Sequence, residues 1–188
     1  MSRLSDLQSE VTERLILEAA LKVLERTGEI TARAAATEAG ISERTLFRYF
    51  SSCDDFLAAV ATALARTVQL PPPPDDAKAL LVLPRALFTA FEQHRGLISA
   101  AWHSELRQHV IAREARERWV GIRKVIDSAA PRAPERRRKV AAATLRHHLS
   151  ATTWHYYRFV MQLPLDETIE AAEMVVEQVL AGVGAKAR

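Results

Sequence analysis

The sequence predicts an all-α protein. Only 6 of its 188 residues are glycine, and alanine, leucine, arginine and glutamate, which are strong helix formers, dominate the composition. No stretch shows the alternation of apolar and polar residues that is typical of a half-buried strand. We expect about nine helices, arranged as an N-terminal three-helix domain with a helix-turn-helix and a larger C-terminal helical bundle.

The helices of the N-terminal region are indicated by their ends. Gly28 follows a run of apolar residues at helical spacing and tolerates the left-handed stop of the first helix. Thr31 and Ser42 are predicted N-caps of two short helices, because their hydroxyl groups can accept a hydrogen bond from a free backbone N–H. Ser52 has the spacing of a capping box and precedes a longer helix. The first predicted helix ends near residue 27. The next three predicted helices span 32–39, 42–50 and 53–68.

A block of four prolines, residues 71–74, separates this region from the remainder. Proline lacks a backbone N–H and fixes φ, so no helix continues through the block. We therefore expect a change of domain here. The predicted domains are a DNA-binding helix-turn-helix domain over 1–52, a connecting helix over 53–70, and a ligand-binding and dimerisation domain over 71–188.

The C-terminal region contains further helices punctuated by proline. Pro84 is expected to kink or restart one of them, and Asp166 is expected to cap the last. Their apolar residues recur at helical spacing, which predicts one buried face on each helix. The predicted helices span 79–94, 96–107, 109–130, 135–162 and 166–183.

The segment over 31–50 predicts a helix-turn-helix. Gly40 lies between its two short helices, where a tight turn is needed that a side chain would obstruct. Leu46 and Phe50, four residues apart, would anchor the second helix to the core together with Ile41. Small side chains lie where the helices would cross, namely Ala35, Ala36 and Ala39.

The outer side of the second helix has the side chains that suit a major groove of DNA. Arginine is the side chain best able to make two hydrogen bonds to guanine, and Arg44 and Arg48 both lie on this side. Thr45 and Tyr49 accompany them. Alone, these charges could form an ordinary solvated helix face; within the motif they indicate DNA contact.

At these residues the chain resembles the TetR family of bacterial transcriptional regulators. The matching positions are Thr31, Ala36, the run 39–42, the run 45–50 and the segment 52–57. By motif the resemblance covers about residues 12 to 65, and the remainder fits in length and helix layout. It implies three DNA-binding helices joined by a fourth to a larger helical domain. That domain would bind a small molecule and dimerise through its last two helices.

The motif and the resemblance together predict the DNA-binding residues. Arg44, Thr45 and Arg48 should face bases or phosphates, and Tyr49 a phosphate. Thr31 and Ser42 should act from helix N-termini, whose N–H groups suit phosphate oxygens. The complete predicted set is Thr31, Arg33, Ser42, Arg44, Thr45, Phe47, Arg48 and Tyr49.

The chain also departs from the family pattern. Ala32 and Ala35 stand where larger apolar residues are usual, which predicts an underfilled small core. Phe47 replaces a frequent tyrosine and Cys53 a usual lysine, so two phosphate contacts are lost. These departures keep open an alternative reading as a helix-bundle interaction protein with a degenerate helix-turn-helix.

The C-terminal region supplies aromatic residues for a ligand pocket between helices, although aromatics at helical spacing usually form the core. The predicted pocket residues are Phe88, Phe91, Trp102, Trp119, His147, Trp154 and Tyr157. His148 and His155 raise a metal hypothesis with His147, but without acid or cysteine partners we favour ordinary hydrogen bonding. Cys53 is interpreted as an inert residue rather than a redox sensor.

The pI of about 9.3 does not by itself indicate DNA binding, because the basic residues are unevenly distributed along the chain. Residues 1–50 hold 7 basic and 8 acidic residues, whereas residues 101–150 hold 12 and 5. The basic excess therefore lies outside the helix-turn-helix, and the DNA-binding argument depends on a local patch of Arg33, Arg44 and Arg48. The basic run 136–139 is interpreted as a solvated helix end.

Several classes of protein are excluded or disfavoured. A single cysteine excludes an internal disulfide and disfavours a cysteine-based zinc site. There is no apolar stretch long enough for a membrane span and no signal-peptide pattern, so we expect a cytoplasmic protein. No phosphate-binding glycine loop, nucleophile elbow or paired metal-ligand motif suggests an enzyme or a cofactor.

The predicted function is a ligand-responsive transcriptional regulator that acts as a repressor. It is expected to bind a near-palindromic operator on double-stranded DNA as a homodimer, which forms through helices 135–162 and 166–183. A small molecule is expected to release it from the DNA.

Overall fold

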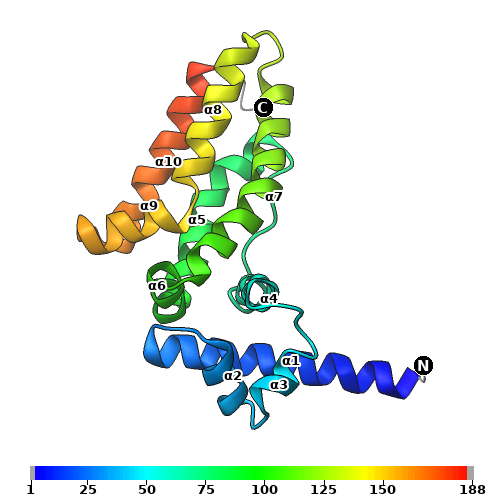
Figure 1. Ribbon diagram of the computed structural model, residues 1–188. Coiled ribbons are helices and arrows are strands. Elements are labelled where there is room, and N and C mark those ends of the chain that lie inside the picture. The colour runs from blue at the N-terminus through cyan, green and yellow to red at the C-terminus, as the bar shows by residue number, and fades with distance from the viewer. Residues whose placement is uncertain (1–2, 186–188) are drawn as a thin grey trace. The chain divides into compact units, whose positions relative to one another are not determined.

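The computed structural model describes the backbone of residues 3–185, with side chains over this range except at 3–5 and 113–117. These residues form helices and no strands, which confirms the predicted all-α class. Eleven helical segments are present over this range, rather than about nine. The chain divides into two compact units (Figure 1). Unit 1 comprises residues 1–67 and 96–111, and unit 2 comprises residues 68–95 and 112–188.

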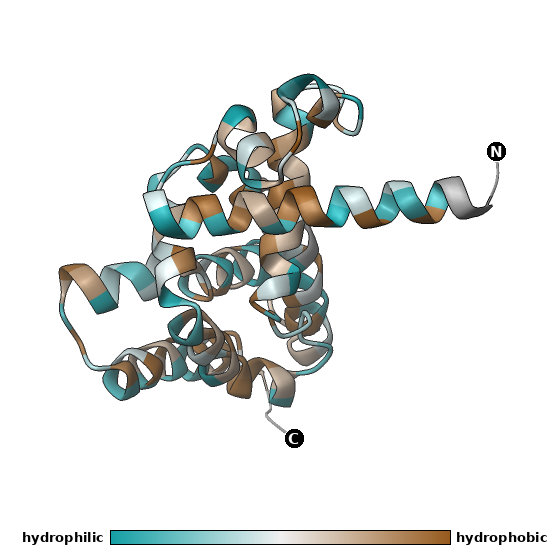
Figure 2. Ribbon diagram, turned by 90° about the horizontal axis from the view of Figure 1, so that it is seen from below, coloured by the Kyte–Doolittle hydropathy of each residue, from teal (hydrophilic) through white to brown (hydrophobic). Residues whose placement is uncertain are grey.

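Unit 1 is built around its first helix. α1 packs against α2 and α4, and α2 packs against α3. The first turns of α1 project past the other helices of the unit (Figures 1 and 2). The helices are α1 (Arg3–Thr27), α2 (Ala32–Glu38), α3 (Glu43–Leu46), α4 (Cys53–Thr67) and α6 (Arg95–His103), and the start of α7 (Leu106–Ala129) follows.

The core of unit 1 joins large side chains from α1, α3 and α4 to small ones from α2. Leu46 and Phe56 are fully buried, and the rings of Phe50 and Phe56 meet edge to face with centroids 5.4 Å apart. Ala32 and Ala35 are also buried. Their small side chains allow α2 to lie close to α1, so burial is achieved at these positions without the larger residues that are usual in the family.

Gly40 makes the turn of the helix-turn-helix for a conformational reason. Its φ is +70°, in the left-handed region that glycine adopts without strain. A Cβ placed there would have no atom within 4 Å, so the sequence interpretation that a side chain would obstruct the turn is wrong. Backbone conformation alone selects glycine.

Unit 2 is a bundle in which α10 packs against α5 and α8. α5 continues through Pro84, so this proline neither ends nor restarts the helix. The predicted proline block is in contact with α7, since a Cβ added at Gly121 would lie 2.8 Å from the Pro73 Cβ. The helices are α5 (Ala77–Gln93), the rest of α7, α8 (Glu135–His148), α9 (Ala151–His155), the π-helix η1 (Tyr156–Val160) and α10 (Leu165–Gly182).

The predicted single helix over 135–162 is wrong, because it is broken at Leu149 and Ser150. Ser150 has extended backbone, and its Oγ accepts from the Thr153 N–H at 3.4 Å and donates to the His147 carbonyl at 2.6 Å. It therefore ends α8 and begins α9. Leu149 and Trp154 are both fully buried, so the apolar pattern continues across the break and resembles that of one helix. This division into α8, α9 and η1 accounts for the larger number of helical segments.

The start of the last helix also differs from the prediction. Pro164 is its N-cap residue, and Asp166 lies in its first turn. Proline suits a helix start because its fixed φ is compatible with the first turn and no N–H is needed there. Asp166 then places its negative charge near the positive end of the helix dipole.

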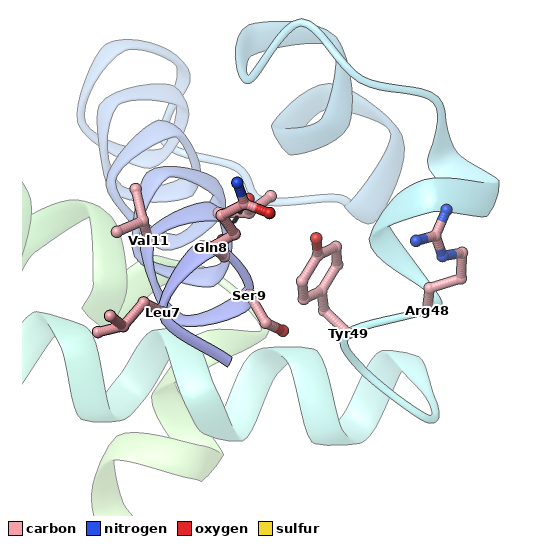
Figure 3. Close-up of a pocket in the computed structure, with 7 residues that line it drawn as sticks. Leu7, Gln8, Ser9, Val11, Arg48 and Tyr49 are labelled. Carbon is pink, nitrogen blue, oxygen red and sulfur yellow. Dashed lines mark hydrogen bonds between the residues drawn. The ribbon is translucent and has the colours of Figure 1, made fainter. Parts of the chain in front are cut away.

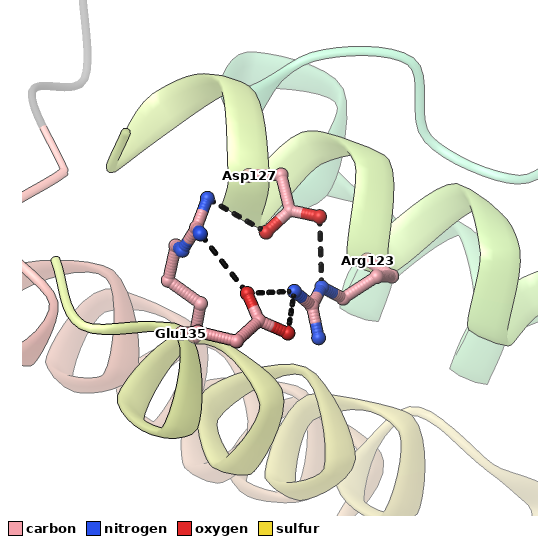
Figure 4. A network of polar contacts seen from close by, with 4 residues as sticks. Arg123, Asp127 and Glu135 are labelled. Carbon is pink, nitrogen blue, oxygen red and sulfur yellow. Dashed lines mark hydrogen bonds and ion pairs between the residues drawn. The ribbon is translucent and has the colours of Figure 1, made fainter. Parts of the chain in front are cut away.

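A ring of four charged residues fastens the end of α7 to the start of α8 (Figure 4). Arg123 contacts Asp127 at 2.8 Å and Glu135 at 2.6 Å, and Arg138 contacts the same two carboxylates at 3.1 and 2.9 Å. The hydrogen bonds from Arg123 lower the pKa values of both Asp127 and Glu135. The basic run 136–139 is therefore not uniformly a solvated end, since Arg138 belongs to this network.

A second polar cluster joins α5 to η1. Glu92 accepts hydrogen bonds from Arg158 Nε at 3.0 Å and Nη2 at 2.8 Å, and from the Trp154 Nε1 at 3.3 Å. Arg158 also donates to the Leu163 carbonyl oxygen. The hydrogen bonds from Arg158 hold the pKa of Glu92 below its ordinary range. This carboxylate thus stabilises the bundle only in its charged form.

Replacing Glu92 with glutamine should lower the free energy of unfolding at pH 7 by about 1.5–3 kcal/mol, since it removes a charge-assisted hydrogen bond. The Glu92 pKa is lower in the folded state, so this contribution is present above the ordinary glutamate pKa and is lost as the pH falls through the folded-state pKa. Denaturation at a series of pH values from 7 downward, followed by a probe in unit 2, measures this loss. Glu173→Gln is the control, because its partner Arg85 is 66% exposed. An effect of Glu92→Gln that stays the same at every pH would contradict the prediction.

Candidate nucleic-acid interface

The second helix of the helix-turn-helix begins with a hydroxyl cap. Ser42 has extended backbone, and its Oγ accepts from the Thr45 N–H at 3.1 Å. The Oγ of Ser42 and the Oγ1 of Thr45 share a hydrogen bond of 2.8 Å. Ser42 is therefore the N-cap expected from the sequence. The two hydroxyls fix the start of α3.

The predicted helix over 42–50 is shorter than expected. Only Glu43–Leu46 is α-helical, and hydrogen bonds from Arg48 N to Thr45 O at 3.1 Å and from Tyr49 N to Leu46 O at 2.9 Å tighten the chain. Such i to i+3 bonds are common at helix ends. The chain stays coiled as far as Phe50, so the side chains keep the distribution expected of a short helix.

The two sides of this segment differ as the sequence predicts. Leu46 and Phe50 are buried and anchor it, while Arg44 and Arg48 are exposed. In the described part of the chain no ion pair joins either arginine to a carboxylate. Both guanidinium groups are thus available to a partner. The other predicted members on this segment are exposed or half-buried, namely Ser42, Thr45, Phe47 and Tyr49.

α2 contributes the remaining predicted residues. Thr31 is its N-cap, with Oγ1 accepting from the Ala34 N–H at 3.1 Å. Thr31 and Arg33 are both exposed. The carboxylate of Glu38, near the end of the same helix, is paired with Arg26 at 2.9 Å. One acidic group of α2 is thereby neutralised on unit 1.

The start of α4 is acidic. Ser52 Oγ accepts from the Asp55 N–H at 3.0 Å, and Asp55 Oδ2 accepts from the Ser51 N–H at 2.9 Å. In the predicted capping box, the Asp55 carboxylate would accept from the Ser52 N–H. The bond that forms is to the Ser51 N–H, one residue earlier. Asp54 lies 3.5 Å from His109, and Cys53 is exposed. Two carboxylates at this helix N-terminus leave the turn before α4 unsuited to a phosphate.

The predicted ligand-pocket residues are only partly brought together. Phe88, Phe91 and Trp154 meet in the core of unit 2, with ring centroids 6.2 Å apart for the first two and 5.8 Å for the last two. Trp102 belongs to unit 1, where the Arg107 guanidinium lies 3.9 Å from its ring centroid. His147 is exposed. Trp119 and Tyr157 are half-buried.

Unit 2 has a pocket of about 510 Å³ that the sequence analysis missed. Its polar lining includes Arg85, Thr89 and Gln93, which recur every fourth residue along α5. This polar row on a helix with a buried apolar face was the available signal. The rest of the lining is Val68, Gln69, Pro71, Ala86, Ala90 and His94.

Two other findings concern the described residues. None of their helices is long and apolar enough to cross a membrane. Within the same residues, no group of three or more histidine, cysteine, aspartate or glutamate side chains is arranged to hold a metal ion.

A capped, surface-exposed second helix with two arginines that pair with no carboxylate of the described residues, anchored by buried residues to a three-helix core, defines a helix-turn-helix DNA-binding protein. Residues 16–60 match the model of the bacterial regulatory proteins of the tetR family. The N-terminal part of the chain is therefore a helix-turn-helix of the kind found in the tetR family of bacterial regulatory proteins.

Solved structures agree with this fold over most of the chain. A protein assigned to the TetR-family transcriptional regulators of Mesorhizobium loti MAFF303099 superposes with a TM-score of 0.60 and 19% identity, over 97% of this chain and 98% of that one. A TetR-family regulator from Streptomyces coelicolor gives 0.59 and 18%, over 92% and 80%. At these identities the likeness concerns the fold. No curated protein sequence matches this chain significantly.

Proposed function

We propose that the protein is a homodimeric repressor that binds a near-palindromic operator and is released by a small molecule. The observation that carries the proposal is the exposure of the guanidinium groups of Arg44 and Arg48, which no carboxylate among the described side chains pairs, on a helix fixed by Ser42 and Leu46. A dimer presents this helix twice, so its operator should be two-fold symmetric. Such a protein would act in the cytoplasm, where it meets its DNA.

The exposed sides of α8 and α10 support dimerisation through the last helices. These two helices pack against each other, and each leaves one large apolar residue on the surface, Val140 at 58% and Met174 at 50% exposure. Around Val140 the exposed charges are basic, and around Met174 they are acidic. Opposite charges favour pairing of α8 of one copy with α10 of another. The charged residues are Arg136, Arg137 and Lys139 on α8 and Glu167, Glu170 and Glu177 on α10.

A small-molecule effector is supported by the pocket of unit 2. Its volume of about 510 Å³ lies in the range of known ligand sites. Thr89 and Gln93 offer hydrogen bonds, and Arg85 lines the pocket while paired with Glu173 at 3.3 Å, which together favour a polar compound. We place the effector there, with the buried cluster of Phe88, Phe91 and Trp154 in the same unit as a further candidate wall. If the effector and DNA favour different states of the dimer, each weakens binding of the other by the same factor.

Selection from a pool of random duplexes tests the proposal. The purified chain should enrich a near-palindromic sequence and shift it at low salt, while an Arg44→Ala/Arg48→Ala double variant should enrich none. Size-exclusion chromatography should show a dimer. If the wild-type chain selects no sequence and shifts no duplex, DNA binding fails and the alternative of a helix-bundle interaction protein takes its place.

A further inference from the structure

Unit 1 has a cleft of about 690 Å³ between the projecting half of α1 and the turn that follows α3. Figure 3 shows the ring of Tyr49 beside Arg48, facing the side of α1 that carries Gln8 and Ser9. The cleft is therefore continuous with the proposed DNA-contacting segment. Its complete lining is Leu7, Gln8, Ser9, Val11, Thr12, Arg48 and Tyr49.

The polar groups of this cleft suit an anion. Arg48 contributes a positive charge, and Gln8, Ser9 and Tyr49 contribute neutral N–H and O–H donors. The Tyr49 hydroxyl makes no hydrogen bond within the described residues. The Thr12 hydroxyl is already used, since it donates to the Gln8 carbonyl at 2.8 Å. No carboxylate lines the cleft.

The acidic residues of α1 are kept away from the cleft by helix geometry. Each residue advances about 100° around the helix axis, which places Asp6, Glu10 and Glu13 on the side opposite Gln8 and Thr12. All three acids are exposed. The first half of α1 is acidic in sum, but Gln8 and Thr12 lie away from these charges, and of the cleft residues Ser9 is the neighbour of Asp6 and Glu13 on the helix surface. A phosphate beside Gln8 would thus meet donors, with the repelling charges on the far side of the helix.

We propose that this cleft binds a phosphodiester of the DNA backbone, and that Gln8 and Ser9 of α1 extend the interface beyond the helix-turn-helix. The inference rests on the proposed DNA-binding function and adds to it a second element of the chain. Leu7 and Val11 give the cleft an apolar part that can contact deoxyribose. A contact to the backbone fixes the protein on the duplex without reading its sequence.

The test compares two variants that change the net charge equally on opposite sides of α1. Gln8→Lys adds one positive charge and Glu10→Gln removes one negative charge, so each raises the net charge by one, and both positions are exposed, so the fold is retained. Binding to a random-sequence 30-bp duplex is measured as a function of salt. Gln8→Lys should bind roughly fivefold tighter and steepen the slope of log K against log salt by about 0.9 per subunit. Glu10→Gln should leave the slope unchanged.

A third variant tests the native side chain. Gln8→Ala should weaken binding about two- to tenfold, as expected for the loss of one hydrogen bond, with no change of slope. Equal effects of Gln8→Lys and Glu10→Gln, or wild-type binding by Gln8→Ala, would overturn the inference while wild-type DNA binding still stands. Failure of the wild-type chain to bind any duplex would instead overturn the proposed function, and this inference with it.

Discussion

Replacing Phe56 with alanine should lower the free energy of unfolding of unit 1 by about 3–5 kcal/mol. Phe56 is fully buried, and its ring meets that of Phe50 with centroids 5.4 Å apart. The alanine would leave a cavity between α4 and the end of the DNA-contacting segment. Since this pair of rings fixes Phe50, the variant should also lose DNA affinity.

Amide hydrogen exchange in α1, α3 and α4 measures this effect on unit 1 separately from unit 2. Phe47→Ala is a matched control, because Phe47 is the same residue type in the same unit but 39% exposed. Its effect on exchange should correspond to less than about 0.5 kcal/mol. Comparable protection in the wild-type chain and Phe56→Ala would show that the aromatic pair does not hold the segment in place.

Replacing Arg44 or Arg48 with alanine should each weaken binding to the selected operator by about 1–3 kcal/mol, or roughly 5- to 150-fold. Both guanidinium groups are exposed, and neither has a carboxylate partner in the described part of the chain, so removal costs the fold little. Replacing the arginine that reads a base should lower the affinity for the operator more than the affinity for random DNA. Replacing the arginine that contacts phosphate should lower both affinities equally.

Arg66→Ala is the charge-matched control for these two variants. Arg66 is exposed in the last turn of α4, roughly 20 Å along the helix from Cys53. It should therefore affect operator binding much less than Arg44→Ala or Arg48→Ala. Fluorescence anisotropy titrations at fixed salt give the comparison. Operator affinities that are the same in all three variants would remove Arg44 and Arg48 from the interface.

The helix-turn-helix could be predicted because its signals are local. Hydroxyl caps at Thr31 and Ser42, the turn at Gly40 and the anchor Leu46 each depend on residues within about one helical turn. Such features depend on the neighbouring residues in the sequence and need no contact with distant parts of the chain. The reason given for Gly40 was nevertheless wrong, since only coordinates show that φ, and not crowding, selects glycine there.

The C-terminal helices show where local signals end. The apolar pattern over 135–162 is unbroken, yet the helix stops at Leu149 because the Ser150 hydroxyl caps a new helix and Trp154 is buried beside Phe91. Which of two helical arrangements forms depends on packing against α5 and α10, which lie far away in the sequence. The same holds for Trp102, which the sequence grouped with Trp154 and the structure assigns to the other unit.

The sequence by itself determined the helical class, the helix-turn-helix and the outward position of Arg44 and Arg48, because these follow from composition and from spacing along one helix. Tertiary structure alone decided the break at Ser150, the pairing of Glu92 with Arg158 and the cleft that brings Gln8 beside Tyr49. The ion pair and the cleft each join residues separated by tens of positions, and the break at Ser150 accompanies the burial of Trp154 beside Phe91, more than sixty residues away. Their meeting depends on how whole helices pack, which no spacing within a helix specifies.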